Sequence, residues 1–128
     1  MFDFFKRKWS RDCEDMRADF QSVMAELAAA DAVQRAAVGE GLNILTTAFV
    51  ARFSSSSSFQ TQPRAEQMQY LKSLVTATDG LSVRDPWVAL GFRLYAMYVA
   101  ALMENDKELL SEIGEQLVPL SREGDFGV

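Results

Sequence analysis

The sequence predicts an all-α fold, a single-domain bundle of about five helices with a very apolar fourth helix at its centre. Two observations lead to this prediction. Apolar residues recur at intervals of three and four along most of the chain, as on one face of a helix, and no stretch shows the alternation of a strand. The chain has 128 residues, 48% hydrophobic and 24% charged, which suits one soluble domain with one core.

The first expected helix covers about residues 3–30. Its opposite face is charged, with Arg11, Asp15 and Asp19 among the polar side chains. The apolar seam comprises Phe2, Phe5, Trp9, Cys13, Met16, Phe20, Val23, Leu27 and Ala30. We therefore expect an amphipathic helix that lies across the rest of the bundle.

A second helix is expected over residues 32–53, because Asp31 followed by Gln34 has the spacing of a capping box. Gly39 and Gly41 each cost about 1 kcal/mol relative to alanine inside a helix. This pair of glycines predicts either a break or a close crossing with a neighbouring helix.

The next segment, residues 54–62, begins with five consecutive serines and has no face that it could bury. Its composition predicts a Ser-rich loop exposed to solvent. Pro63 suits the first turn of a third helix, which we expect over residues 63–79, ending at Asp79-Gly80.

The fourth helix is expected over residues 86–104, where Asp85 supplies a capping carboxylate and Pro86 stands at the first helical position. It is apolar around its whole axis and reaches the lower length limit of a membrane span. Arg93 near its middle disfavours a span, so we expect this helix at the centre of a soluble bundle. A long charged side chain there needs a partner, and Arg93 is expected to meet a carboxylate or helix carbonyls.

Asn105-Asp106 turns the chain into a fifth helix, expected over residues 106–118 and ended by Pro119. The helical bundle is therefore expected to occupy residues 1–121. Residues 122–128 are expected to form a flexible tail.

The composition excludes most familiar catalytic sites. The chain has no His and one Cys, so it has no His-based metal site, no Ser-His or Cys-His pair and no internal disulfide. It also has no Gly-rich phosphate loop and no nucleophile elbow. We expect no enzyme activity, no catalytic or metal-ligating residues and no cofactor, and a cytoplasmic location because disulfides are absent.

The charge is unevenly distributed along the chain. The last 25 residues hold seven acidic and two basic residues, which accounts for the whole net charge of −5. Residues 1–20 are neutral overall but concentrate positive charge at Lys6, Arg7, Lys8 and Arg11. An acidic chain without a basic stripe is not expected to bind nucleic acid.

The beginning of the chain is the main candidate interaction surface. It combines aromatic rings with three consecutive cations and comprises Phe2, Phe4, Phe5, Lys6, Arg7, Lys8 and Trp9. Our leading hypothesis is a non-catalytic protein–protein interaction or regulatory module that uses this segment, together with the acidic C-terminal region, to bind a protein partner or a second copy of itself. Complementary charge at the two ends favours an antiparallel pairing.

Two alternatives remain open. The aromatic and basic residues 1–9 could instead anchor the protein peripherally at a membrane surface, with the rings toward lipid and the cations toward anionic headgroups. A third hypothesis is a small-molecule site inside the bundle, built from Arg93, Tyr95 and Tyr98 with Trp87, since ligand pockets need a few convergent polar groups around a concave space.

Overall fold

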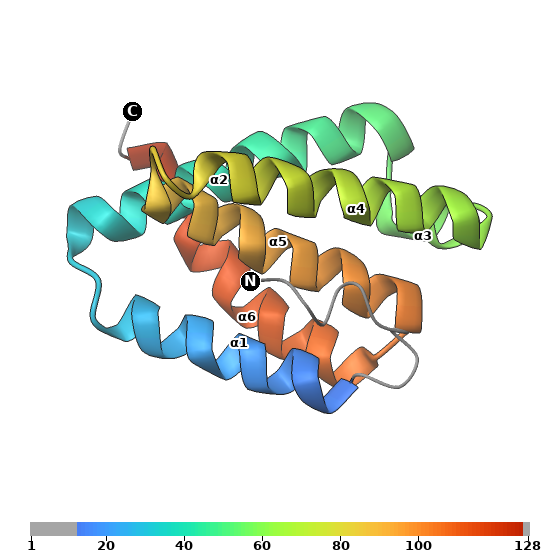
Figure 1. Ribbon diagram of the computed structural model, residues 1–128, viewed down its shortest axis with the longest axis horizontal. Helices are drawn as coiled ribbons and strands as arrows, with labels where there is room; N and C mark the ends of the chain where they lie inside the picture. The colour runs from blue at the N-terminus through green and yellow to red at the C-terminus, as the bar shows by residue number, and fades with distance from the viewer. Residues whose placement is uncertain (1–12, 127–128) are drawn as a thin grey trace.

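The most apolar helix of the chain occupies the middle of the computed structural model, which describes residues 13–126 (Figure 1). Those residues form helices and no strand, so the predicted all-α bundle is confirmed. The helices are α1 (Cys13–Ala28), α2 (Ala32–Phe53), α3 (Ser56–Gln60), α4 (Arg64–Leu81), α5 (Pro86–Glu104) and α6 (Lys107–Phe126).

Helix α5 is the centre of the packing, as its composition predicted. It contacts each of the other described helices, and Figure 1 shows α4 and α6 on either side of it. Of the described helices, α5 alone is long and apolar enough to cross a membrane by length and composition. Within the bundle, 72% of this apolar stretch is buried against protein.

Glycines bring α2 and α5 into backbone contact where they cross. A β-carbon on Gly41 would lie 2.5 Å from the carbonyl oxygen of Val88, and one on Gly91 would overlap the carbonyl oxygen of Val38. Only glycine leaves room for such an approach. The close crossing predicted from the glycine pair in α2 is confirmed, and α2 continues through it without a break.

Local capping chemistry fixes the starts of α2, α5 and α6. Asp31 and Gln34 form the predicted capping box, with each side chain accepting a hydrogen bond from the other residue's amide at 2.8–2.9 Å. Asp85 accepts from the amide of Val88 at 3.3 Å, ahead of the proline at the first helical position. Asp106 likewise accepts from an amide of the first turn of α6, at 3.1 Å.

The prediction of a loop at residues 54–62 is wrong, because this segment contains the short helix α3. Ser55 caps this helix by accepting a hydrogen bond from the amide of Ser58 at 3.1 Å. Phe59 anchors this helix to the core, since its side chain is fully buried and its ring centroid lies 4.9 Å from that of Phe53. One apolar anchor and one serine cap are therefore enough to fold a segment whose composition resembles a linker.

The expected end of the last helix at Pro119 is also wrong, because α6 continues to Phe126 and includes most of the predicted tail. A proline removes one backbone donor but leaves the following amides able to continue a helix. Leu120 is fully buried directly after it, and the side-chain amide of Asn43 donates to the carbonyl oxygen of Ser121 at 3.1 Å. These tertiary contacts outweigh the local break.

Smaller differences occur at other helix boundaries. Helix α1 ends at Ala28 rather than at residue 30, and α4 and α6 each begin one residue later than expected. Helix α4 extends two residues beyond the expected end at residue 79. The first helix is described from Cys13 to Ala28, and its expected portion at residues 3–12 lies outside the described residues.

Candidate functional site

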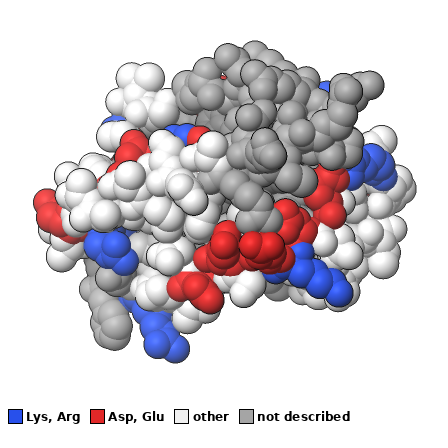
Figure 2. Space-filling model, turned by 90° about the horizontal axis from the view of Figure 1, so that it is seen from below, with Lys and Arg blue, Asp and Glu red and all other residues white. Residues whose placement is uncertain are grey.

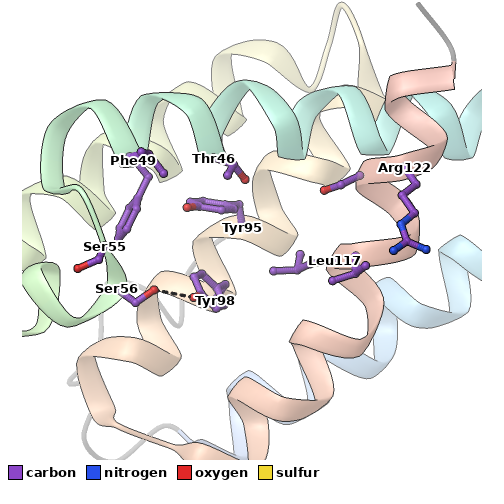
Figure 3. Close-up of a pocket in the computed structure, with 11 residues that line it drawn as sticks. Thr46, Phe49, Ser55, Ser56, Tyr95, Tyr98, Leu117 and Arg122 are labelled. Atoms are coloured by element: carbon purple, nitrogen blue, oxygen red, sulfur yellow. Dashed lines mark hydrogen bonds between the residues drawn. The ribbon is translucent and has the colours of Figure 1, made fainter.

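A pocket of about 440 Å³ opens between α2, α3, α5 and α6 (Figure 3). Most of its surface is apolar, and its apolar lining includes Phe49 and Val50 from α2 and Leu117 and Val118 from α6. Val50 and Val118 are each about half exposed, so apolar surface continues outward from the pocket over both helices. The volume falls within the range of roughly 300–1,000 Å³ that is common for ligand sites.

Hydroxyl groups line the pocket on every side. They belong to Ser55 and Ser56 at the start of α3, Tyr95 and Tyr98 on α5, Thr46 on α2 and Ser121 on α6. The hydroxyls of Tyr98 and Ser56 form a hydrogen bond at 2.9 Å, which ties the start of α3 to α5 (Figure 3). Tyr95 is buried, and Thr46 lines the pocket with it. Burial raises the pKa of Tyr95 above its ordinary value, the nearby Tyr70 and Tyr98 raise it further, and the side chain of Thr46 acts in the opposite direction. Tyr95 is therefore a neutral hydroxyl near pH 7, suited to hydrogen bonding.

A single cation lies at one end of the pocket. Arg122 lines it from the last turns of α6, and Figure 3 shows its side chain on the opposite side from Phe49, Ser55 and Ser56. Arg122 is exposed and forms no ion pair with any residue that the structure describes. None of the described residues that line the pocket is acidic.

A packed aromatic cluster supports the inner wall of the pocket. The ring centroid of Phe49 lies 5.5 Å from that of Phe59, 5.9 Å from that of Tyr70 and 6.1 Å from that of Tyr95. These spacings are typical of favourable tilted and edge-on aromatic pairs. The Tyr70 hydroxyl is buried without a hydrogen-bond partner among the described residues, and this burial raises the pKa of Tyr70. The guanidinium of Arg52 covers the outside of the cluster, 5.4 Å from the centre of the Tyr70 ring.

Arg93 does not belong to this pocket. Its Nε atom donates to Oδ2 of Asp19 at 3.2 Å, a second guanidinium nitrogen contacts Oδ1 of the same residue, and Nη1 lies 3.7 Å from Oε2 of Glu26. The predicted carboxylate partner of Arg93 is thus confirmed, and the pair fastens α1 to α5. Burial lowers the pKa of Arg93 from its ordinary value.

The structure therefore separates the residues that the sequence grouped into one pocket. Tyr95 and Tyr98 line it, whereas Arg93 faces α1 and the partly buried Trp87 packs against the core. Sequence reasoning missed Ser56 and Arg122. Ser56 stands in the segment interpreted as a loop, and Arg122 lies beyond the proline that was expected to end the helix.

The other candidate surface, comprising Phe2, Phe4, Phe5, Lys6, Arg7, Lys8 and Trp9, lies outside the described residues. Its contact with a protein partner or a membrane stays a prediction. Among the side chains that the structure describes, no group of three or more Cys, Asp or Glu residues is arranged to hold a metal ion.

Comparisons with family models, with curated proteins and with solved structures give no significant match.

Proposed function

We propose that the protein is a non-catalytic binding module that takes a small amphipathic molecule in the pocket between α2, α3, α5 and α6. The observation that carries this proposal is the composition of the pocket, whose mostly apolar lining includes several hydroxyl groups and, among the described residues, one cation. A few placed polar groups in a mostly apolar cavity are typical of sites that orient a small ligand.

The lining supports binding more than catalysis. Its described polar groups are serine, threonine and tyrosine hydroxyls and one guanidinium, with no carboxylate, imidazole or thiol. General acid–base catalysis needs a group with a pKa near the working pH. The raised pKa of Tyr95 moves that hydroxyl further from this range.

The test fills the pocket and leaves the core unchanged. Val50 lines the pocket and is 52% exposed, so Val50→Trp places a large ring at the opening with little disturbance of the fold. Val33→Trp is the matched control, because Val33 is on the same helix, is 80% exposed and lies outside the pocket.

The measurement is a titration with octanoate and 1-octanol, followed by amide NMR. Perturbed amides are expected to cluster at the lining residues of α2, α3, α5 and α6 in the parent protein and in Val33→Trp. Val50→Trp is expected to lose most of this response. The proposal is wrong if neither probe perturbs these amides, or if Val50→Trp binds as well as its control.

The surface of α6 favours a second candidate function, self-association through opposite charges. Glu108, Glu112 and Glu115 are exposed on this helix, and their spacing places them on one face. Figure 2 shows acidic side chains gathered on one face of the molecule. The basic residues 6–11 supply the complementary charge in the sequence. Charge of this kind sets the orientation and rate of an encounter more than its affinity.

The test of self-association is the molar mass in solution, measured by light scattering at low salt and at about 0.5 M salt. A dimer at low salt that dissociates at high salt supports pairing through charge. A monomer under both conditions rules it out.

A further inference from the structure

We infer that the ligand of the α2–α3–α5–α6 pocket is an amphipathic monocarboxylate, bound with its carboxylate at Arg122 and its apolar body between Phe49, Tyr95 and Leu117. The inference rests on the proposed function and names the chemical class of its ligand. Its basis is the presence of one cation, Arg122, in a mostly apolar lining without a described acidic residue.

The described lining of the pocket carries one positive charge, although the protein as a whole carries −5. Arg122 is the charged residue of the described lining, and it has no ion pair with a described residue that would neutralise it. A ligand cation would meet repulsion there, and a neutral ligand could accept only a weaker hydrogen bond from the guanidinium. A monoanion would gain a charge-assisted hydrogen bond, which is stronger than a neutral one.

A carboxylate fits this single cation better than a phosphate does. The planar guanidinium offers a pair of parallel donors that match the two oxygens of a carboxylate. A doubly charged phosphate is usually held by several cations or by backbone amides at the start of a long helix. The lining provides one arginine, and the remaining described groups are hydroxyls and apolar side chains.

The residues near Arg122 determine which apolar group the ligand can carry. In Figure 3, Leu117 stands beside it on α6, and Tyr95 and Tyr98 lie between this helix and Phe49. A chain or ring that enters from the arginine therefore contacts Leu117 and the tyrosine rings on its way to Phe49. Thr46 and Ser121 add hydroxyl groups to the walls from α2 and α6. One water molecule takes up about 30 Å³ in the liquid, and we assign each non-hydrogen atom of the ligand the same volume. A pocket of about 440 Å³ then has room for roughly 15 such atoms. This is the size of a medium-chain fatty acid or an aryl alkanoic acid.

The experiment compares three probes that share one alkyl chain and differ in charge: octanoate, 1-octanol and octylammonium. Dissociation constants are measured at low salt by amide NMR for the parent protein, for Arg122→Gln and for Arg84→Gln. Arg84 is the matched control, because it is also an exposed arginine but does not line the pocket. Glutamine keeps a polar side chain and removes the charge.

The expected result for the parent protein is that octanoate binds about two- to fivefold more tightly than 1-octanol, the range for one exposed ion pair, and octylammonium binds most weakly. This preference should vanish in Arg122→Gln, persist in Arg84→Gln and shrink at about 0.5 M salt, where exposed charges are screened.

If octanoate and 1-octanol bind equally in the pocket of the parent protein, the carboxylate is not recognised and the inference fails while the proposed function stands. A preference that survives Arg122→Gln also overturns the inference. If none of the probes binds in the pocket, the proposed function fails with it.

Discussion

The α-carbon of Gly91 on α5 faces the carbonyl oxygen of Val38 on α2, and a β-carbon at residue 91 would overlap that oxygen. The same β-carbon would lie 3.2 Å from the amide nitrogen of Leu42. The neighbours on the α2 side are backbone atoms, which cannot rotate away as the end of a side chain can. The separation of the two central helices therefore depends on the absence of one methyl group.

Replacing this glycine should destabilise the bundle even though alanine is the better helix former. Gly91→Ala is expected to lower the free energy of unfolding by about 1–3 kcal/mol, because α2 and α5 must move apart. Gly114→Ala is the control, since its β-carbon would meet nothing within 4 Å, and it should stabilise α6 by about 0.5–1 kcal/mol. Urea unfolding of both variants measures the difference, and equal effects would contradict a steric role for Gly91.

The Ser-rich segment should depend on one side chain. Phe59 is fully buried, and its backbone oxygen accepts a hydrogen bond from the side chain of Gln67 at 3.0 Å. Phe59→Ala is expected to cost about 3–5 kcal/mol, the usual range for deleting a buried aromatic ring. Hydrogen exchange should show α3 losing protection before the other helices. Ser57→Ala, at an exposed position of the same helix, should change stability by less than about 0.5 kcal/mol.

The sequence predicted those parts of the fold whose signals are local. The caps at Asp31 and Asp85 and the close crossing at Gly41 depend on residues a few positions apart or on one residue type. Helix α3 and the end of α6 depend instead on partners far along the chain. The hydroxyl of Ser56 at the start of α3 bonds that of Tyr98, 42 positions away. The carbonyl oxygen of Ser121, after Pro119, accepts a hydrogen bond from Asn43, 78 positions away.

The candidate site likewise contains residues that local sequence signals predict and residues that they do not. Tyr95 and Tyr98 were predicted because they stand in the most apolar helix, but grouping them with Arg93 ignored the helical period. Residues two apart lie about 200° apart around a helix axis, so Arg93 and Tyr95 face different neighbours. The pairing of Tyr98 with Ser56 spans 42 positions, and no local pattern marks it.

The ion pair between α1 and α5 should contribute more to the free energy of unfolding than an exposed ion pair does. The side chain of Asp19 is 15% exposed and that of Arg93 is 26% exposed. Asp19→Ala is expected to cost about 1–3 kcal/mol, because it leaves a partly buried guanidinium without its main acceptor. Glu26→Gln should cost less than about 0.5 kcal/mol, since the Glu26 side chain is 53% exposed. Urea unfolding should separate the two, and similar losses would refute the assignment of Asp19 as the main partner.

Alkaline pH should weaken the fold through the buried tyrosines. The pKa of Tyr95 and that of Tyr70 are raised above the ordinary value of 10.0, chiefly by burial. The folded state therefore binds these protons more tightly than the unfolded state does. The free energy of unfolding should be constant with respect to these groups below pH 10 and fall as the pH rises above it, by at most about 1.4 kcal/mol per pH unit for each group.

The variant Tyr95→Phe identifies the group responsible for part of this dependence. It should reduce the fall in the free energy of unfolding between about pH 10 and 11, where the parent protein begins to lose its tyrosine protons on unfolding. Urea unfolding at several pH values gives both slopes. An unchanged slope in Tyr95→Phe would show that Tyr95 ionises equally in both states.

Removing the hydroxyl group should affect stability differently at Tyr70 and at Tyr98. The hydroxyl of Tyr70 is buried and has no hydrogen-bond partner among the described residues, whereas that of Tyr98 bonds Ser56 at 2.9 Å. Tyr70→Phe removes a desolvated polar group and should leave stability unchanged or raise it by up to about 1 kcal/mol. Tyr98→Phe breaks a hydrogen bond between α3 and α5 and should lower stability by about 0.5–1.5 kcal/mol. A loss in Tyr70→Phe as large as in Tyr98→Phe would mean that a bound water or ligand satisfies the Tyr70 hydroxyl behind the wall of the pocket.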